Sequence, residues 1–120
     1  MALISIAQPA QWNELIQSLP GAHALQTWQW AQAKSQFGWE PHPLVWRDDS
    51  GRVVAGALVL QRRMMQRVFA MRLSVMYAPR GPLLDWSDQD LVQQVLQDLQ
   101  DFARKKGAIF IKIDPDLPLG

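Results

Sequence analysis

The chain has 120 residues, of which 48% are hydrophobic and 19% are charged, and its formal net charge is +1. These values fit a globular protein with a modest core, and they exclude a disordered chain and one that binds nucleic acid through overall charge alone. Because the chain has no cysteine, disulfides, zinc–thiolate sites and a cysteine nucleophile are excluded. We find neither a membrane-span pattern nor a signal-peptide pattern, so we expect a cytoplasmic protein.

The first third of the chain predicts a strand and two helices. Residues 3–6 indicate a short strand, and residues 10–19 carry apolar side chains at helical spacing, ended by Pro20. Thr27 is a suitable N-cap for a second helix that extends to about Gln36, with Gly38 as its C-cap. We expect one face of this second helix to consist of Trp30, Ala33 and Phe37.

The middle third changes to a period of two residues. Residues 43–48 and 53–60 favour strands, and the turn residues between them predict a β-hairpin with a largely buried second strand. Residues 62–67 form a basic interruption, and residues 69–77 predict another strand. This part of the chain holds a basic cluster of Arg62, Arg63, Arg67 and Arg72. The cluster is either a solvated hairpin tip or a surface that contacts the phosphates of tRNA or of an anionic lipid surface.

The segment Pro79-Arg80-Gly81-Pro82 follows this strand. Because each proline lacks an amide donor, we expect the strand ladder to end before it. Gly81 permits a sharp turn, and Arg80 is then presented on a stiff loop at the carboxyl end of a strand, where functional residues of α/β folds gather. A rigid connector with a solvated arginine is the alternative.

The last third predicts a long helix and a final strand. Ser87 and Asp90 approximate a capping box, an apolar stripe follows at helical spacing, and Gly107 ends the helix. Residues 108–114 are apolar at nearly every position, which is typical of a strand covered on both faces. The predicted order is β-α-α-β-β-β-α-β. Because one helix is available to cover the last strand, we expect residues 1–120 to be a single partial domain.

This order resembles the first half of the acetyltransferase fold often called GNAT, an α/β (α+β) fold with a mixed sheet. Members of that superfamily bind the coenzyme A pyrophosphate on a glycine-rich loop and the amides of the following helix. The corresponding loop here, residues 78–82, has two prolines and one glycine. Since most of the amide donors are missing, coenzyme A binding and acetyl transfer are disfavoured.

Three segments of the sequence carry a closer resemblance: Gln26-Thr-Trp-Gln-Trp-Ala-Gln-Ala-Lys34 with a later Trp39, Tyr77-Ala-Pro-Arg-Gly-Pro-Leu-Leu-Asp85, and Ile111-Lys-Ile-Asp-Pro-Asp116. In this order they resemble the FemABX family, the peptidoglycan-bridge aminoacyltransferases linked to methicillin resistance in some bacteria. The resemblance covers essentially the whole chain but only the beginning of such a protein. Family members are several times longer, with two GNAT-like domains around a cleft.

The resemblance implies transfer of an amino acid from aminoacyl-tRNA to the stem peptide of a lipid- or nucleotide-linked muramyl precursor, without metal or coenzyme A, at or near the inner face of the membrane. It assigns Lys34, Arg80, Trp30 and Tyr77 to substrate binding. Lys34 acts as a point charge and Arg80 as a bidentate partner for phosphate. Asp114 is the candidate general base. Most residues that face the aminoacyl-tRNA belong outside this chain, so we expect the chain alone to be inactive.

Each of these assignments has a plainer alternative. Lys34 suits the exposed flank of an amphipathic helix, and Asp114 suits the start of a turn. Trp28 and Trp30 are two residues apart and cannot share a helical face, although core packing suits both.

The competing hypothesis is a non-catalytic binding or assembly module with a GNAT-like fold, which associates with itself through an exposed sheet edge. It predicts no binding of a cell-wall precursor. His23 and His42 are far apart in the sequence and lack ligand spacing, so neither hypothesis includes a metal site.

Overall fold

The computed structural model describes residues 2–17, 19, 27–68 and 71–115. Its elements are β1 (Leu3–Ile6), a 3₁₀ turn (Pro9–Gln11), α1 (Trp12–Ile16), α2 (Trp28–Ser35), β2 (Glu40–Arg47), β3 (Val53–Val68), β4 (Met71–Arg80), β5 (Leu83–Leu84), α3 (Gln89–Lys105) and β6 (Ala108–Pro115). The predicted order of elements is confirmed, with the 3₁₀ turn and the two-residue β5 as additions. No helix in these described ranges is long and apolar enough to cross a membrane.

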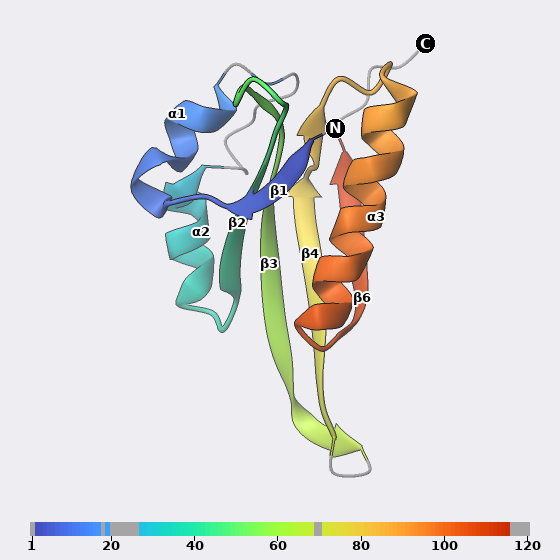
Figure 1. The fold of residues 1–120 in the computed structure, drawn as a ribbon. Helices are drawn as coiled ribbons and strands as arrows, with labels where there is room; N and C mark the ends of the chain where they lie inside the picture. Colours follow the sequence, from blue (N-terminus) through green and yellow to red (C-terminus); the bar gives the residue numbers. More distant parts are fainter. Residues whose placement is uncertain (1, 18, 20–26, 69–70, 116–120) are drawn as a thin grey trace.

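The strands form one mixed sheet in the order β1-β2-β3-β4-β6, with β5 beside β3. Strand pairs are antiparallel except for β4 and β6, which run parallel because α3 carries the chain back between them. Figure 1 shows α1 and α2 on one side of the sheet and α3 on the other. This mixed sheet between helices confirms the predicted α+β class.

Two hydrophobic clusters lie on opposite faces of the sheet, because successive side chains of a strand point to opposite sides. The cluster under α3 includes Leu44, Trp46, Val59, Met76, Val95 and Leu99. The cluster under α1 and α2 includes Trp12, Ile16, Ala31, Val45 and Leu58. Burial of each large side chain stabilises the fold by roughly 1.5–3 kcal/mol relative to its exposed state.

A buried polar network joins the three central strands to the end of α3. Gln61 Nε2 donates to Ser74 Oγ at 2.9 Å and to the Lys106 carbonyl oxygen at 3.0 Å. Gln61 Oε1 lies 2.9 Å from His42 Nε2. Because the carboxamide nitrogen of Gln61 faces two acceptors, its oxygen accepts from His42, which therefore carries its proton on Nε2. The network fixes the register of β2, β3 and β4 at one level of the sheet.

The strand β3 does not stop at the basic stretch. An interruption was expected over residues 62–67, but β3 continues to Val68 and pairs with β4, with Arg67 directly opposite Arg72. Backbone pairing does not require apolar side chains, and in Figure 1 the two strands extend together past the other elements. The predicted interruption is therefore wrong. Phe69, where the next strand was expected to begin, lies outside the described residues.

The strand β4 also continues past its expected end. Its pairing with β3 stops at Tyr77, and β3 then pairs with β5. Its parallel pairing with β6 continues, with Pro79 opposite Asp114 and Arg80 opposite Pro115. A proline is tolerated here because, in the described part of the sheet, this end of β4 keeps a partner on one side only. The expectation that the ladder ends before Pro79 is therefore correct for the pairing of β4 with β3 and wrong for its pairing with β6.

The helix starts differ from the predicted ones by a few residues. The helix expected over residues 10–19 is a 3₁₀ turn followed by α1, and residues 18 and 20 lie outside the described part. The hydroxyl of Thr27 caps α2 as predicted, accepting a backbone N–H at 3.4 Å. The N-cap of α3 is Asp88 rather than Ser87. Ser87 instead donates to Asp85 Oδ1 from its hydroxyl at 2.6 Å and from its amide at 3.0 Å.

The face that α2 turns to the core is that of Ala31 rather than the face predicted to hold Trp30, Ala33 and Phe37. Ala31 is buried, whereas Ala33 is exposed and the side chain of Phe37 is 67% exposed. The small side chain of Ala31 lets the helix approach the sheet closely, and Trp28 packs against the same cluster. The C-cap of α2 is Gln36, and the predicted C-cap residue Gly38 lies two residues beyond it, with φ of 87°.

The last strand, β6, lies at an edge of the sheet. Ile111 and Ile113 pack against the cluster under α3. Ile109 and Phe110 are 56% and 54% exposed, so the described residues do not cover both faces of this strand. In the described part of the chain α1 and α2 cover β2 and β3, and this leaves one face of β4 and β6 open.

Candidate functional site

Among the described residues, no helix covers the continuation across β4 and β6 of the sheet face that lies under α1 and α2. Leu58 packs under these helices, and Leu60 lies two residues farther along β3 on the same face. Leu60 is opposite Tyr77 on β4, and Tyr77 is opposite Lys112 on β6, so all three side chains share this face. Asp114 lies two residues beyond Lys112. We call the area defined by Tyr77, Lys112 and Asp114 the open face.

Three different functional groups meet on the open face. Tyr77 Oη donates to Asp114 Oδ2 at 3.4 Å, and Lys112 Nζ lies 5.6 Å from the centroid of the Tyr77 ring. Tyr77 is half-buried, and Lys112 and Asp114 are exposed. A carboxylate that accepts a proton therefore lies beside a phenol and an ammonium group that attracts anions.

The Pro79–Pro82 turn lies next to this group. The Asp114 amide donates to the Gly81 carbonyl oxygen at 3.2 Å, and the Gly81 amide donates to the Ala78 carbonyl oxygen at 3.2 Å. The peptide bond between Gly81 and Pro82 is cis. The backbone of Arg80 lies at the same end of the sheet, and its side chain is outside the described part of the structure. Two motifs far apart in the sequence therefore meet around Asp114.

The helix α2 contributes the other predicted binding residues. Lys34 Nζ lies 5.4 Å from the centroid of the Trp30 ring one turn earlier, and both side chains are half-buried. Trp39 follows the helix, and the centroid of its ring lies 5.7 Å from the guanidinium carbon of Arg62 on β3. No hydrogen bond or ion pair among the described residues joins Lys34 to Asp114. The site thus has two parts, one on α2 and one on the open face, each with a cation against an aromatic ring.

Sequence reasoning missed Lys112 and the contact between Arg62 and Trp39. Lys112 could have been found from the period of a strand, because it lies two residues before Asp114 and so shares its face. The contact between Arg62 and Trp39 could not have been found in this way, because Trp39 lies outside β3 and the period of a strand relates only residues of the same strand.

His42 lies on the face of the sheet that α3 covers, opposite the open face. His42 is buried and is hydrogen-bonded to Gln61. Its ring also packs against that of Phe102, with the two ring centroids 5.3 Å apart. His23 lies outside the described residues, and among those that are described no three potential ligands converge on one point. Hydrogen bonds from the Ser50 hydroxyl lower the pKa of Asp48, and those from Ser87 lower the pKa of Asp85.

The chain matches the family model described as the FemAB family over residues 9–119. It is 30% identical over 101 residues to aminoacyltransferase FemA of Staphylococcus aureus (strain MW2), a match that covers 84% of this chain and 23% of FemA. The crystal structure of FemX has a TM-score of 0.79 at 24% identity, covering 98% of this chain and 28% of FemX.

Acetyltransferases share the same fold at greater distance. Glucosamine-6-phosphate N-acetyltransferase from Arabidopsis thaliana has a TM-score of 0.55 at 13% identity, covering 98% of this chain and 84% of that protein. The expected GNAT-like fold is therefore confirmed. The chain spans about a quarter of the length of FemA and FemX.

Proposed function

The chain belongs to the FemAB family, and on that basis we propose that it is the acceptor-binding part of an aminoacyltransferase that builds peptidoglycan bridges. The acceptor is a lipid- or nucleotide-linked muramyl peptide, and the donor is aminoacyl-tRNA, which we assign to regions outside residues 1–120. The reaction takes place in the cytoplasm at the inner face of the membrane, where such an acceptor is available. Family membership and the likeness to aminoacyltransferase FemA support this proposal.

The observation that carries the proposal is that each of the two parts of the site, on α2 and on the open face, holds a cation against an aromatic ring. Lys34 lies against Trp30, and Lys112 lies against Tyr77. A cation that already packs on a ring loses little further side-chain entropy when it binds an anion. In this proposal Lys34 and Arg80 bind the phosphates of the precursor, while Trp30 and Tyr77 pack against its sugar or base.

Asp114 is the proposed general base. The side-chain amine of the stem peptide attacks the ester carbonyl carbon of the aminoacyl-tRNA, so a C–N bond forms and the C–O bond to the ribose breaks. The Asp114 carboxylate takes the proton from the attacking nitrogen and returns it to the departing ribose oxygen. The exposure of Asp114 and its contact with the Tyr77 hydroxyl support this role, since the carboxylate is both accessible and oriented.

The proposal is tested by calorimetric titration of the full-length protein with a nucleotide-linked muramyl pentapeptide. The substitution Lys34→Met removes the charge while retaining an unbranched stem near Trp30. Lys105→Met is the matched control, because Lys105 is an exposed lysine in the last turn of α3. We expect the Lys34 variant to bind about tenfold more weakly and the control to bind as the wild type does. Equal affinities for all three proteins contradict the proposal.

A second candidate function is an assembly module, and the exposed side chains of Ile109 and Phe110 on the edge strand β6 favour it. An uncovered edge strand with apolar side chains is a template for pairing with another chain. This candidate predicts concentration-dependent association in sedimentation, which Ile109→Lys abolishes, and no precursor binding. Precursor binding by a protein that remains a monomer rules it out.

A further inference from the structure

We propose that the open face selects an acceptor whose reacting amine stands beside a carboxylate, as in a diaminopimelate side chain, over an acceptor with a plain lysine. The inference rests on the proposed function, which brings the reacting amine to Asp114, and deepens it by naming the chemical class of the acceptor residue. Its basis is that Lys112 and Asp114 present opposite charges on one face of β6 without pairing with each other.

The two charges are neighbours on the open face. Lys112 and Asp114 are two residues apart on the edge strand β6, so their side chains lie on the same face and their Cα atoms are about 6.5–7 Å apart. Both side chains are exposed. Among the described residues, no carboxylate oxygen lies within 4.0 Å of the Lys112 ammonium nitrogen. The open face therefore presents a positive and a negative group side by side, and neither neutralises the other.

Tyr77 contacts both groups with different parts of its side chain. Lys112 Nζ lies over its ring, 5.6 Å from the centroid, and its hydroxyl donates to Asp114 Oδ2 at 3.4 Å. Tyr77 is half-buried and is the direct partner of Lys112 in the register of β4 and β6. One anchored side chain thus positions the ammonium group and the carboxylate relative to each other.

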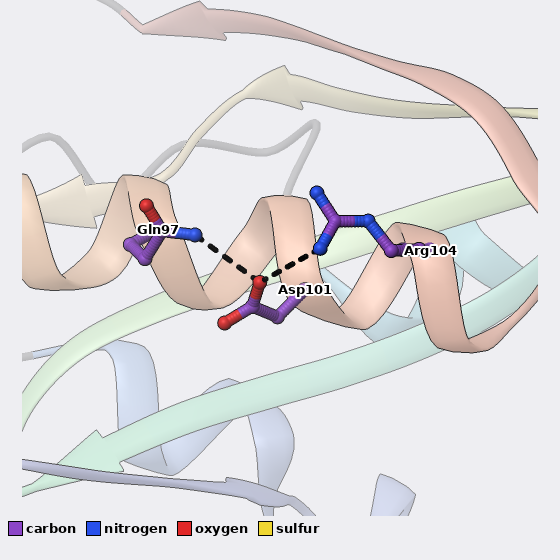
Figure 2. Close-up of polar contacts among 3 residues, drawn as sticks. All are labelled: Gln97, Asp101 and Arg104. Atoms are coloured by element: carbon purple, nitrogen blue, oxygen red, sulfur yellow. Dashed lines mark hydrogen bonds and ion pairs between the residues drawn. The ribbon is translucent and has the colours of Figure 1, made fainter.

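Opposite charges are arranged differently on the exposed surface of α3. There Asp101 Oδ1 accepts from Gln97 Nε2 at 3.1 Å and lies 3.8 Å from a guanidinium nitrogen of Arg104 (Figure 2). Those charges are paired within the helix. The charges of Lys112 and Asp114, in contrast, remain available to an external group.

The separation of Lys112 and Asp114 suits a ligand that carries both an amine and a carboxylate. A charge-assisted hydrogen bond is about 2.7–2.9 Å long. One such bond from a ligand amine to Asp114 and another from Lys112 to a ligand carboxylate bridge a gap of this size when the two ligand groups share one carbon atom. The amine of a plain lysine reaches Asp114 alone and leaves Lys112 hydrated. A ligand group with a single charge therefore satisfies half of the arrangement.

The test is calorimetric titration of the full-length protein with two nucleotide-linked muramyl pentapeptides. They differ only in the residue that carries the side-chain amine, which is lysine in one and diaminopimelate in the other. A third ligand is the diaminopimelate peptide with its side-chain carboxylate amidated. The substitution Lys112→Met removes the charge and keeps an unbranched stem beside Tyr77. Lys105→Met is the matched control, because Lys105 is an exposed lysine in the last turn of α3.

We expect the wild type and the control to bind the diaminopimelate peptide about tenfold more tightly than the lysine peptide, and to bind the amidated peptide as they bind the lysine peptide. The Lys112 variant is expected to bind all three peptides with the affinity that the wild type shows for the lysine peptide. The comparison of the wild type with this variant isolates the contact between Lys112 and the carboxylate.

Equal binding of the lysine and diaminopimelate peptides by the wild type overturns the inference and leaves the proposed function standing, because the precursor is still bound. A preference that persists in the Lys112 variant also overturns it, since the carboxylate is then recognised elsewhere. The same is true of an equal loss for both peptides, which indicates that Lys112 binds a group they share. Binding of neither peptide by the wild type contradicts the proposed function itself, and the inference with it.

Discussion

Tyr77 Oη lies 3.4 Å from Asp114 Oδ2 and joins β4 to β6 across 37 positions of the sequence. The backbone of the same residue is also held, because the Asp114 amide donates to the Gly81 carbonyl oxygen at 3.2 Å. A residue held through both its backbone and its side chain, and open to solvent, is suited to meet a substrate. This contact defines the position of the proposed general base.

Substitution of Asp114 by Asn is expected to impair chemistry more than binding. Loss of a general base lowers a transfer rate by about 10²- to 10⁴-fold, while the neutral amide retains the size of the carboxylate. We expect single-turnover transfer by the full-length protein to slow within this range and the affinity for the precursor to change little. Tyr77→Phe, which removes only the orienting hydroxyl, is expected to slow transfer less. An unchanged rate in Asp114→Asn contradicts the assignment.

The buried network around Gln61 predicts a stability effect. Gln61→Leu leaves the Lys106 carbonyl oxygen and His42 Nε2 without their partners, and we expect the free energy of unfolding to fall by about 1–3 kcal/mol. Urea unfolding followed by tryptophan fluorescence measures this change. Gln97→Leu, at an exposed position of α3, is the control and is expected to change the free energy of unfolding by less than about 0.5 kcal/mol. Equal effects of the two substitutions contradict the role of the network.

The turn before α3 predicts a pH effect. Hydrogen bonds from the hydroxyl and the amide of Ser87 hold the pKa of Asp85 below its ordinary value of 3.8. Because the pKa is lower in the folded state, the stabilisation is present above the ordinary pKa and is lost as the pH falls through the folded value. Ser87→Ala is expected to raise the pKa of Asp85 in an NMR titration and to leave that of Asp48 unchanged. No rise at Asp85 contradicts the assigned cause.

Much of the fold follows from local patterns in the sequence. Thr27 is the observed N-cap of α2, and Gly38 and Gly107 lie two residues and one residue beyond the observed C-caps of α2 and α3, because these signals depend on neighbouring backbone groups alone. The strand boundaries at Val68 and Arg80 were missed because pairing depends on a partner strand elsewhere in the chain. A proline interrupts pairing only where the strand has a partner on both sides, and a run of arginines does not prevent backbone pairing.

The candidate site could be predicted residue by residue but not as an arrangement. Lys34 and Asp114 were each identified from a motif, and the sequence does not show that they belong to separate parts of the site. Their placement depends on how α2 packs over the sheet, where Ala31 is the buried side chain of the helix. The exposure of Ile109 likewise depends on strand order, which periodicity within one strand does not encode.

The central claim is that cations of the candidate site, Lys34 on α2 among them, bind the phosphates of a cell-wall precursor. The most direct test is a cycle of titrations in which the full-length wild type and Lys34→Met each bind the nucleotide-linked muramyl pentapeptide and the same muramyl pentapeptide without its nucleotide diphosphate. We predict that Lys34→Met weakens binding of the nucleotide-linked form about tenfold and leaves binding of the phosphate-free form unchanged. An equal loss for both ligands, or no loss for either, contradicts the claim.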